Sequence, residues 1–198
     1  MQDIKKKLAT YISEKRYSHT LNVVEKATEL ANAHNIDHDK AYYAALIHDA
    51  AKEFSPDKCR QKNIKLDDYL DTIYKNYKPI WHALIIDQFA AIEFDIKDNA
   101  VLEAAKWHTT GHPNMSTLAK IIFIADYIDP LRGFTNQNEL EKLAKESLND
   151  AMAIILIKTI HFLSLNQQPI YEATIACYNK ILLDLTISKN KINELLKL

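Results

Sequence analysis

A histidine and an aspartate stand side by side within the otherwise apolar stretch ALIHDAAKEF, residues 44–53. Adjacent helical residues point about 100° apart, so His48 and Asp49 cannot both face one core, but both can flank a single point beside the helix. A metal ion suits such a point, because it binds an imidazole nitrogen and a carboxylate oxygen together. An isolated pair is better explained by a core histidine and an ion pair of Asp49 with Lys52, so a metal site needs further ligands.

Two other segments supply candidate ligands. His19 lies at a predicted helix start in RYSHTLNVV, and Asp126 lies in the middle of the apolar segment IIFIADYIDP. A buried carboxylate without a partner is costly, so Asp126 needs a cation nearby. Two imidazoles and two carboxylates from three helices suit iron, manganese or a similar divalent ion with water in the open positions. Closed tetrahedral zinc fits less well, because the set contains no thiolate.

Two more histidines each follow a tryptophan directly on a predicted helix. His82 lies in KPIWHALIIDQF and His108 in AAKWHTTGHPNMS. Either could hold a second metal ion or hydrogen-bond a phosphate oxygen, and the sequence leaves open whether one ion or two are bound. The role of His112, which also lies near this segment, stays open.

Two basic residues are candidate phosphate ligands. Lys52 lies one turn beyond His48, and Arg132 follows Asp126 and Pro130 and offers a planar fork suited to phosphate. Surface ion pairs are the alternative for both.

The only two glycines also fall beside candidate ligands. Gly111 directly follows Thr109 and Thr110, and Gly133 directly follows Arg132. Glycine there permits close approach of the backbone to a substrate. Both threonines are therefore possible phosphate donors, although a threonine at a helix end is as often only a connector.

The elements that must position these residues are predicted to be helices. Apolar residues recur at intervals of three and four, as in Leu21, Val24, Ala27 and Ala31. The 198 residues include only 2 glycines, where average usage would give roughly 14. Tight hairpins and glycine-rich phosphate loops are therefore excluded, and Walker and Rossmann nucleotide sites with them. We expect an all-α protein.

Capping residues and breaks predict the helix boundaries. Residues 63–66 are expected to form a break, and the chain is expected to end in a short charged tail of which residues 185–198 carry no functional signal. The expected helices run from Ser18 to about Ala33, from Asp37 or Asp39 to about Ala51, from Ser55 with Pro56 at its first turn, and over about 80–94, 98–108, 116–129, 139–165 with a possible break near Asn149, and 171–187.

Composition and charge limit the kinds of partner that the protein is expected to bind. The formal net charge is −1, and the charges are spread along the chain, so no electrostatic footprint for nucleic acid is visible. Cys59 and Cys177 lie far apart without a CxxC motif, no signal peptide is recognisable, and the longest apolar stretches fall well short of a membrane span of about 20 residues. We expect a reduced, cytoplasmic protein that binds neither nucleic acid nor membrane.

The order His19, His48 with Asp49, then Asp126 resembles the H…HD…D pattern of the HD phosphohydrolase superfamily. The chain is similar in particular to its bacterial YqeK-like group of symmetrical diadenosine tetraphosphate hydrolases. That resemblance spans about residues 16–179 in four blocks, of which the last is the weakest: RYSHTLNVVEKATELA, AYYAALIHDAAKEF, WHTTGHPNMSTLAKIIFIADYIDPLR and PIYEATIACYNK.

The resemblance implies a fold and an activity. The fold would be one all-helical HD domain over residues 1–198, with its core at about 16–135 and C-terminal helices at 139–198 that complete a nucleotide pocket. The activity would be hydrolysis of diadenosine tetraphosphate at its centre to two ADP, on a divalent metal, with iron as the expected ion and manganese or a similar ion as the alternative.

The resemblance also implies roles for residues. The metal ligands would be His19, His48, Asp49 and Asp126, with His82 and His108 at a possible second ion. The catalytic set would be Asp49, Lys52, His82 and His108. The substrate contacts would be Lys52, His82, Thr109, Thr110, Arg132, Ile170, Tyr171 and Thr174, of which the last three lie where the last long helix begins.

Two rival functions keep the same four ligands. One is an HD nucleotidase that acts on a deoxynucleotide or a guanosine alarmone. The other is a nucleotide-binding sensor without turnover. In each case the partner is a small nucleotide, and a homodimer is possible.

Overall fold

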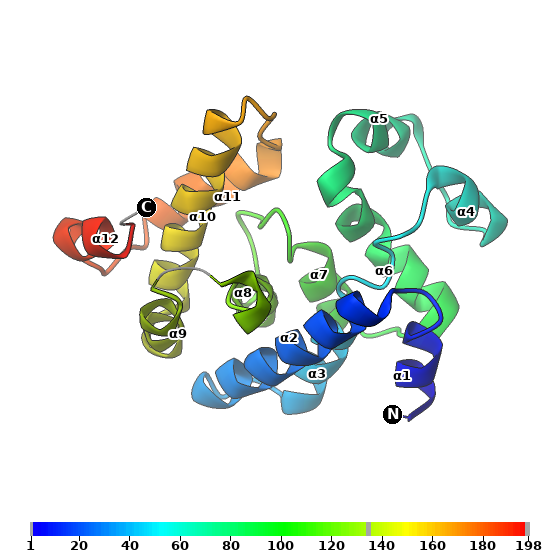
Figure 1. Ribbon diagram of the computed structural model, residues 1–198, viewed down its shortest axis with the longest axis horizontal. Helices are drawn as coiled ribbons and strands as arrows, with labels where there is room; N and C mark the ends of the chain where they lie inside the picture. Colours follow the sequence, from blue (N-terminus) through cyan, green and yellow to red (C-terminus); the bar gives the residue numbers. More distant parts are fainter. Residues whose placement is uncertain (1, 134–135, 197–198) are drawn as a thin grey trace.

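The computed structural model describes residues 2–133 and 136–196, and within these residues all regular secondary structure is helical (Figure 1). The prediction of an all-α protein is confirmed. The helices are α1 (Gln2–Leu8), α2 (Glu14–Ala33), α3 (His38–Ile47), α4 (Pro56–Gln61), α5 (Asp68–Asn76), the 3-10 helix η1 (Lys78–Ile80), α6 (Trp81–Phe94), α7 (Asn99–Lys106), α8 (Thr117–Tyr127), the 3-10 helix η2 (Pro130–Arg132), α9 (Gln137–Glu146), α10 (Leu148–Leu165), α11 (Glu172–Leu182) and α12 (Lys189–Leu195).

Helices α2, α3, α7 and α8 form the centre of the molecule. Helix α2 packs against α3 and α8, and α7 packs against α3, α6 and α8. Helix α10 packs on α8, α9 and α11, so α10–α12 lie on one flank of the centre and α4–α6 on the other (Figure 1). The central helices are rich in fully buried small and branched residues, such as Ala44, Ala104 and Ile121. Small side chains let these helices approach one another closely.

Side-chain caps explain several helix starts. Asp37 accepts a hydrogen bond from the backbone N–H of Lys40 at α3, and Ser55 accepts one from Lys58 at α4. Pro56 occupies the first turn of α4, where no N–H is needed. The predicted starts at Asp37 and Ser55 are therefore confirmed.

Other predicted boundaries are wrong. Helix α2 begins at Glu14, and Ser18 lies inside it, where its hydroxyl donates to the carbonyl of Glu14. Helix α3 ends at Ile47 rather than near Ala51, and residues 48–53, which include the ligand pair, form turns.

The C-terminal elements also differ from their predicted bounds. The break in the long predicted helix falls at Ser147, whose hydroxyl caps α10, and α11 ends at Leu182 rather than at residue 187. Helices α1, α5 and α12 were not predicted.

Helix α10 corrects the expectation that apolar stretches are too short for a membrane. Within the described part of the chain, α10 is the one helix that is long and apolar enough to cross a membrane, over Leu148–Leu165. Of that stretch 44% is buried inside the protein, and core helices of soluble proteins pass the same test. The buried part is its first half, from Leu148 to Leu156.

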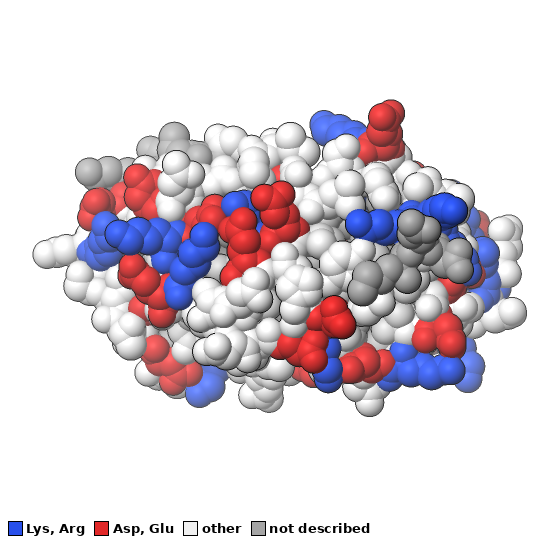
Figure 2. Space-filling view, turned by 90° about the horizontal axis from the view of Figure 1, so that it is seen from below, with Lys and Arg blue, Asp and Glu red and all other residues white. Residues whose placement is uncertain are grey.

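Charged residues of both signs are interspersed on the face seen from below (Figure 2). This face therefore offers no broad field of one sign. The two thiols, Cys59 and Cys177, are buried and free, and burial raises the pKa of each to about 11.

Candidate metal centre

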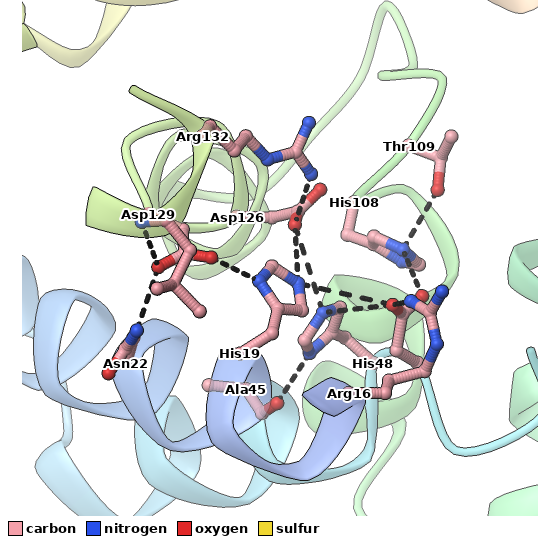
Figure 3. A network of polar contacts seen from close by, with 12 residues as sticks. Arg16, His19, Asn22, Ala45, His48, His108, Thr109, Asp126, Asp129 and Arg132 are labelled. Atoms are coloured by element: carbon pink, nitrogen blue, oxygen red, sulfur yellow. Dashed lines mark hydrogen bonds and ion pairs between the residues drawn. The ribbon is translucent and has the colours of Figure 1, made fainter. Parts of the chain in front are cut away.

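Four predicted ligands from three helices converge at one point (Figure 3). His19 comes from α2, His48 and Asp49 from the end of α3, and Asp126 from α8. The Nε2 atom of His19 lies 3.1 Å from Asp126 Oδ1 and 3.9 Å from Asp49 Oδ2. The Nε2 atom of His48 lies 3.9 Å from the same two oxygens. Two nitrogens and two oxygens therefore face a common centre, a mixed donor set that suits a hard divalent ion.

His48 is oriented for this role by the end of α3. Its Nδ1–H donates to the carbonyl of Ala45 at 2.6 Å, which leaves the Nε2 lone pair directed at the other ligands. That Nε2 atom is buried and has no hydrogen-bond partner among the described residues. Burial lowers the pKa of His48 to about 4, so the imidazole is neutral at pH 7. A buried, neutral, unpartnered nitrogen fits a metal ligand.

His19 is oriented by a residue that the sequence did not point out. Its Nδ1–H donates to Oδ2 of the buried Asp129 at 2.5 Å, and Asn22 donates to Oδ1 of the same carboxylate at 2.9 Å (Figure 3). Burial opposes protonation of His19, but its contacts with Asp126 and Asp129 outweigh that effect and raise its pKa. A carboxylate behind a histidine is the usual partner of a metal-binding imidazole. The available signal was a second acidic residue three positions after Asp126.

The two carboxylates of the centre are ionised and balanced by arginines. Arg16 Nη1 contacts Asp49 Oδ2, and Arg132 Nη2 lies 2.7 Å from Asp126 Oδ1. Burial would raise the pKa of both acids, but nearby histidines lower that of Asp49, and His19 and Arg132 lower that of Asp126. Arg16 was also missed from the sequence, although it lies one helical turn before His19.

A second group of predicted residues surrounds the other oxygen of Asp49. Oδ1 lies 2.8 Å from His82 Nε2, 3.6 Å from His108 Nε2 and 3.5 Å from Lys52 Nζ. Burial lowers the pKa of His82 to about 3 and also lowers that of Lys52. His108 Nδ1 donates to the carbonyl of Ala105 at 2.6 Å, which turns Nε2 toward Asp49. Asp49 therefore joins the first ligand group to this second one.

Some of the predicted substrate-binding residues lie near the ligand cluster and others lie farther from it. Thr109 reaches the second group, with its hydroxyl 2.8 Å from His108 Nε2. Thr110 is buried and its hydroxyl donates to the carbonyl of Gly111, so it faces away from the cluster.

Ile170, Tyr171 and Thr174 lie at the start of α11. The hydroxyl of Tyr171 contacts that of Tyr69 from α5 at 2.5 Å, and its ring packs beside Leu84. Tyr171 therefore lies at the junction of the two flanks rather than at the ligand centre.

The two tryptophans pack beside the second group. The buried Trp81 donates to the carbonyl of Phe54 at 3.1 Å, and Trp107 stacks on His112 with the ring centroids 4.4 Å apart. His112 thus acts here as a packing partner.

Comparison with known proteins agrees with this geometry. The HD domain family matches residues 16–131, which include all four converging ligands. This chain belongs to the HD family. A symmetrical bis(5'-nucleosyl)-tetraphosphatase of Halalkalibacterium halodurans is 40% identical, with 88% of this chain and 92% of that protein covered. A Bacillus subtilis protein of the same name is 37% identical over 85% of this chain and 90% of its own length.

A solved structure gives the same fold. It is a Clostridium acetobutylicum protein described as a predicted HD superfamily hydrolase involved in NAD metabolism. It is 37% identical, covers 93% of this chain and 97% of its own, and has a TM-score of 0.83. Membership of the HD family and the His and Asp groups that could hold an ion together indicate a divalent-metal site.

Proposed function

We propose that this HD-family protein hydrolyses diadenosine tetraphosphate at its centre and releases two ADP. The observation that carries the proposal is the converging set of two imidazoles and two carboxylates, in which the buried Nε2 of His48 has no partner among the described residues. The names of relatives that match 85% or more of this chain support the substrate.

His19, His48, Asp49 and Asp126 would hold the ion. When bound there, a divalent metal lowers the pKa of a water ligand and neutralises charge on the attacked phosphoryl group. Iron is the ion we favour, with manganese as the alternative, and a second ion would use His82 and His108. At pH 7 His48 is neutral and both acids are ionised, which are the protonation states that metal ligands need.

The second group would serve the phosphates and the attacking water. Asp49 Oδ1 faces His82 and would orient the water by accepting its hydrogen bond. Lys52 and Arg132 are the cations of this cluster that can bind phosphate oxygens, and Thr109 and His108 can donate to them. The water oxygen bonds to one inner phosphorus, the bond from that phosphorus to the central bridging oxygen breaks, and the bridging oxygen leaves with the second ADP.

The nucleoside contacts would lie at the junction of the flanks. Tyr171 and Tyr77 place aromatic rings there with centroids 5.8 Å apart, next to Trp107, which directly precedes His108 in the chain. Aromatic rings suit contact with a base or a sugar. Ile170 and Thr174, which neighbour Tyr171 in the sequence, would add to these contacts. We further propose that residues 1–198 act as one domain in the cytoplasm, with a small nucleotide as partner and a homodimer as a possible assembly.

The test is to incubate the protein with diadenosine tetraphosphate and ferrous or manganous ion under reducing conditions and to separate the nucleotides by ion exchange. ADP as the sole product is expected. Asp49→Asn should abolish turnover while the helical circular dichroism and thermal unfolding stay close to wild type, and the exposed Asp39→Asn should stay active. ATP with AMP would contradict central cleavage, and turnover of only a deoxynucleotide or guanosine alarmone in a substrate panel would replace the substrate.

A further inference from the structure

Each carboxylate oxygen that faces the metal centre also contacts an arginine. Arg16 contacts Asp49 Oδ2, the oxygen 3.9 Å from both His19 Nε2 and His48 Nε2. Arg132 contacts Asp126 Oδ1, the oxygen 3.1 Å from His19 Nε2. The two guanidinium groups approach the ligand cluster from two sides (Figure 3). The lone pairs that an ion would use are therefore engaged by cations of the protein itself.

The carboxylates of this cluster have cations of the protein beside them. Its carboxylates are Asp49, Asp126 and Asp129, and its cations among the described residues are Arg16, Arg132 and Lys52. Three carboxylates are thus matched in number by three cations of the protein. Burying two such carboxylates without cations would be strongly unfavourable.

Both arginine side chains are partly exposed and can move away from the carboxylates that they contact. Their side chains are 30% and 38% exposed, whereas the side chain of Asp49 is 4% exposed. Arg16 lies in the first turn of α2 and Arg132 at the end of η2, so each reaches the carboxylate from the rim of the site. A guanidinium at the rim can turn toward solvent or an anion without opening the core, while the ligands stay in place.

We infer that Arg16 is a positioning residue that holds Asp49 in the metal-free protein and competes with the ion for Asp49 Oδ2, with Arg132 doing the same at Asp126. Loading the ion then exchanges cations: the guanidinium group leaves the oxygen that the ion takes. Binding of the ion adds two positive charges to the cluster, which favours an anionic ligand. The inference rests on the metal site of the proposed function.

The experiment is a Mn²⁺ titration by calorimetry, without nucleotide, on wild type, Arg16→Gln and Arg16→Lys. Arg16→Gln removes the competing charge, so we expect Mn²⁺ to bind about 10-fold more tightly. Arg16→Lys keeps the charge and should stay close to wild type. Arg60→Gln, which breaks an exposed ion pair with Asp71 at 2.9 Å, is the matched control and should change nothing.

Thermal unfolding gives a second readout. The metal-free Arg16→Gln protein should have a lower Tm than wild type, and saturating Mn²⁺ should restore most of the difference, because the ion then supplies the missing charge. Weaker Mn²⁺ binding by Arg16→Gln would overturn the inference, since Arg16 would then support the bound form. Unchanged affinity would overturn it as well. Failure of the wild type to bind Mn²⁺ would defeat the metal site itself, a different result.

Discussion

Asp129 shows how a single buried side chain prepares a metal ligand without touching the centre. It accepts hydrogen bonds from His19 and Asn22 and from the backbone N–H of Leu131. These three donors fix the carboxylate, and the carboxylate fixes the proton of His19 on Nδ1. The ligand atom Nε2 is thereby left free to bind.

We predict that Asp129→Asn weakens Mn²⁺ binding by about 10-fold to 100-fold, because the amide no longer attracts the proton of Nδ1 as strongly. Titration calorimetry measures the affinity, and circular dichroism checks the fold. Asn22→Ala is the matched control, because it removes one donor to Asp129 but keeps the contact with His19, and its effect should be smaller. Equal losses in the two variants would contradict the orienting role of Asp129.

For single residues, the sequence points to those whose polar side chains stand in apolar segments. His48, Asp49 and Asp126 are polar residues in apolar helices, and this contrast is visible without a structure. Asp129 precedes a proline at a helix end, where an acidic cap is ordinary. Arg16 looks like any basic residue of a first helical turn. Their roles depend on contacts with residues 110 and 33 positions away, which no local pattern contains.

At the scale of elements, the loop after α7 packs closely against α11 because Gly111 has no side chain. Gly111 has a φ of +67°, and a Cβ added there would lie 2.8 Å from the Sγ atom of Cys177. The same loop carries Thr109, whose hydroxyl contacts His108. The close packing of a glycine on a cysteine therefore helps to place the second group of the site.

We predict that Gly111→Ala lowers the free energy of unfolding by about 2–4 kcal/mol, from the left-handed backbone and from the contact with Cys177. Gly133→Ala is a matched control: its φ is +62°, and a Cβ would meet nothing within 4 Å among the described residues. In Gly133→Ala the free energy of unfolding should fall only by the cost of the left-handed backbone, about 1 kcal/mol. Urea unfolding measures both, and equal losses would show that Cys177 does not restrict the loop.

The element boundaries show where local signals suffice. Asp37 and Ser55 cap helices as predicted, because a short polar side chain before a helix satisfies an N–H within the same turn. The end of α3 could not be predicted, since Ala50 and Ala51 favour continuing the helix, yet the chain turns from His48 onward. Helix α5 was missed although Asp67 caps it, because only Ile73 in it is buried.

At the scale of the whole molecule, the buried histidines link folding to pH. The pKa of His48 is about 4 and that of His82 about 3, both depressed by burial from an unfolded value of about 6.5. The unfolded chain therefore binds more protons than the folded protein in the range between these values. Stability is then lost as the pH falls below about 6.5. The raised pKa of His19 acts in the opposite direction.

We predict that the metal-free protein loses stability between pH 6 and pH 5, with each of the two histidines contributing up to about 1.4 kcal/mol per pH unit. Urea unfolding at pH 7.5, 6 and 5 measures this dependence. His82→Gln should reduce the slope by one such contribution, whereas the exposed His161→Gln should leave it unchanged. A slope unaffected by His82→Gln would show that this imidazole is not held neutral by the fold.

The burial of both native thiols has a practical consequence. With a pKa of about 11, each is thiolate at pH 7 only to about one part in ten thousand, and neither is open to a reagent. A maleimide spin label should therefore react only with a cysteine introduced on the surface, for example at Thr72 of α5 together with Phe162 of α10. The distance between two such labels, recorded with and without nucleotide, would report directly whether the two flanks close around a ligand.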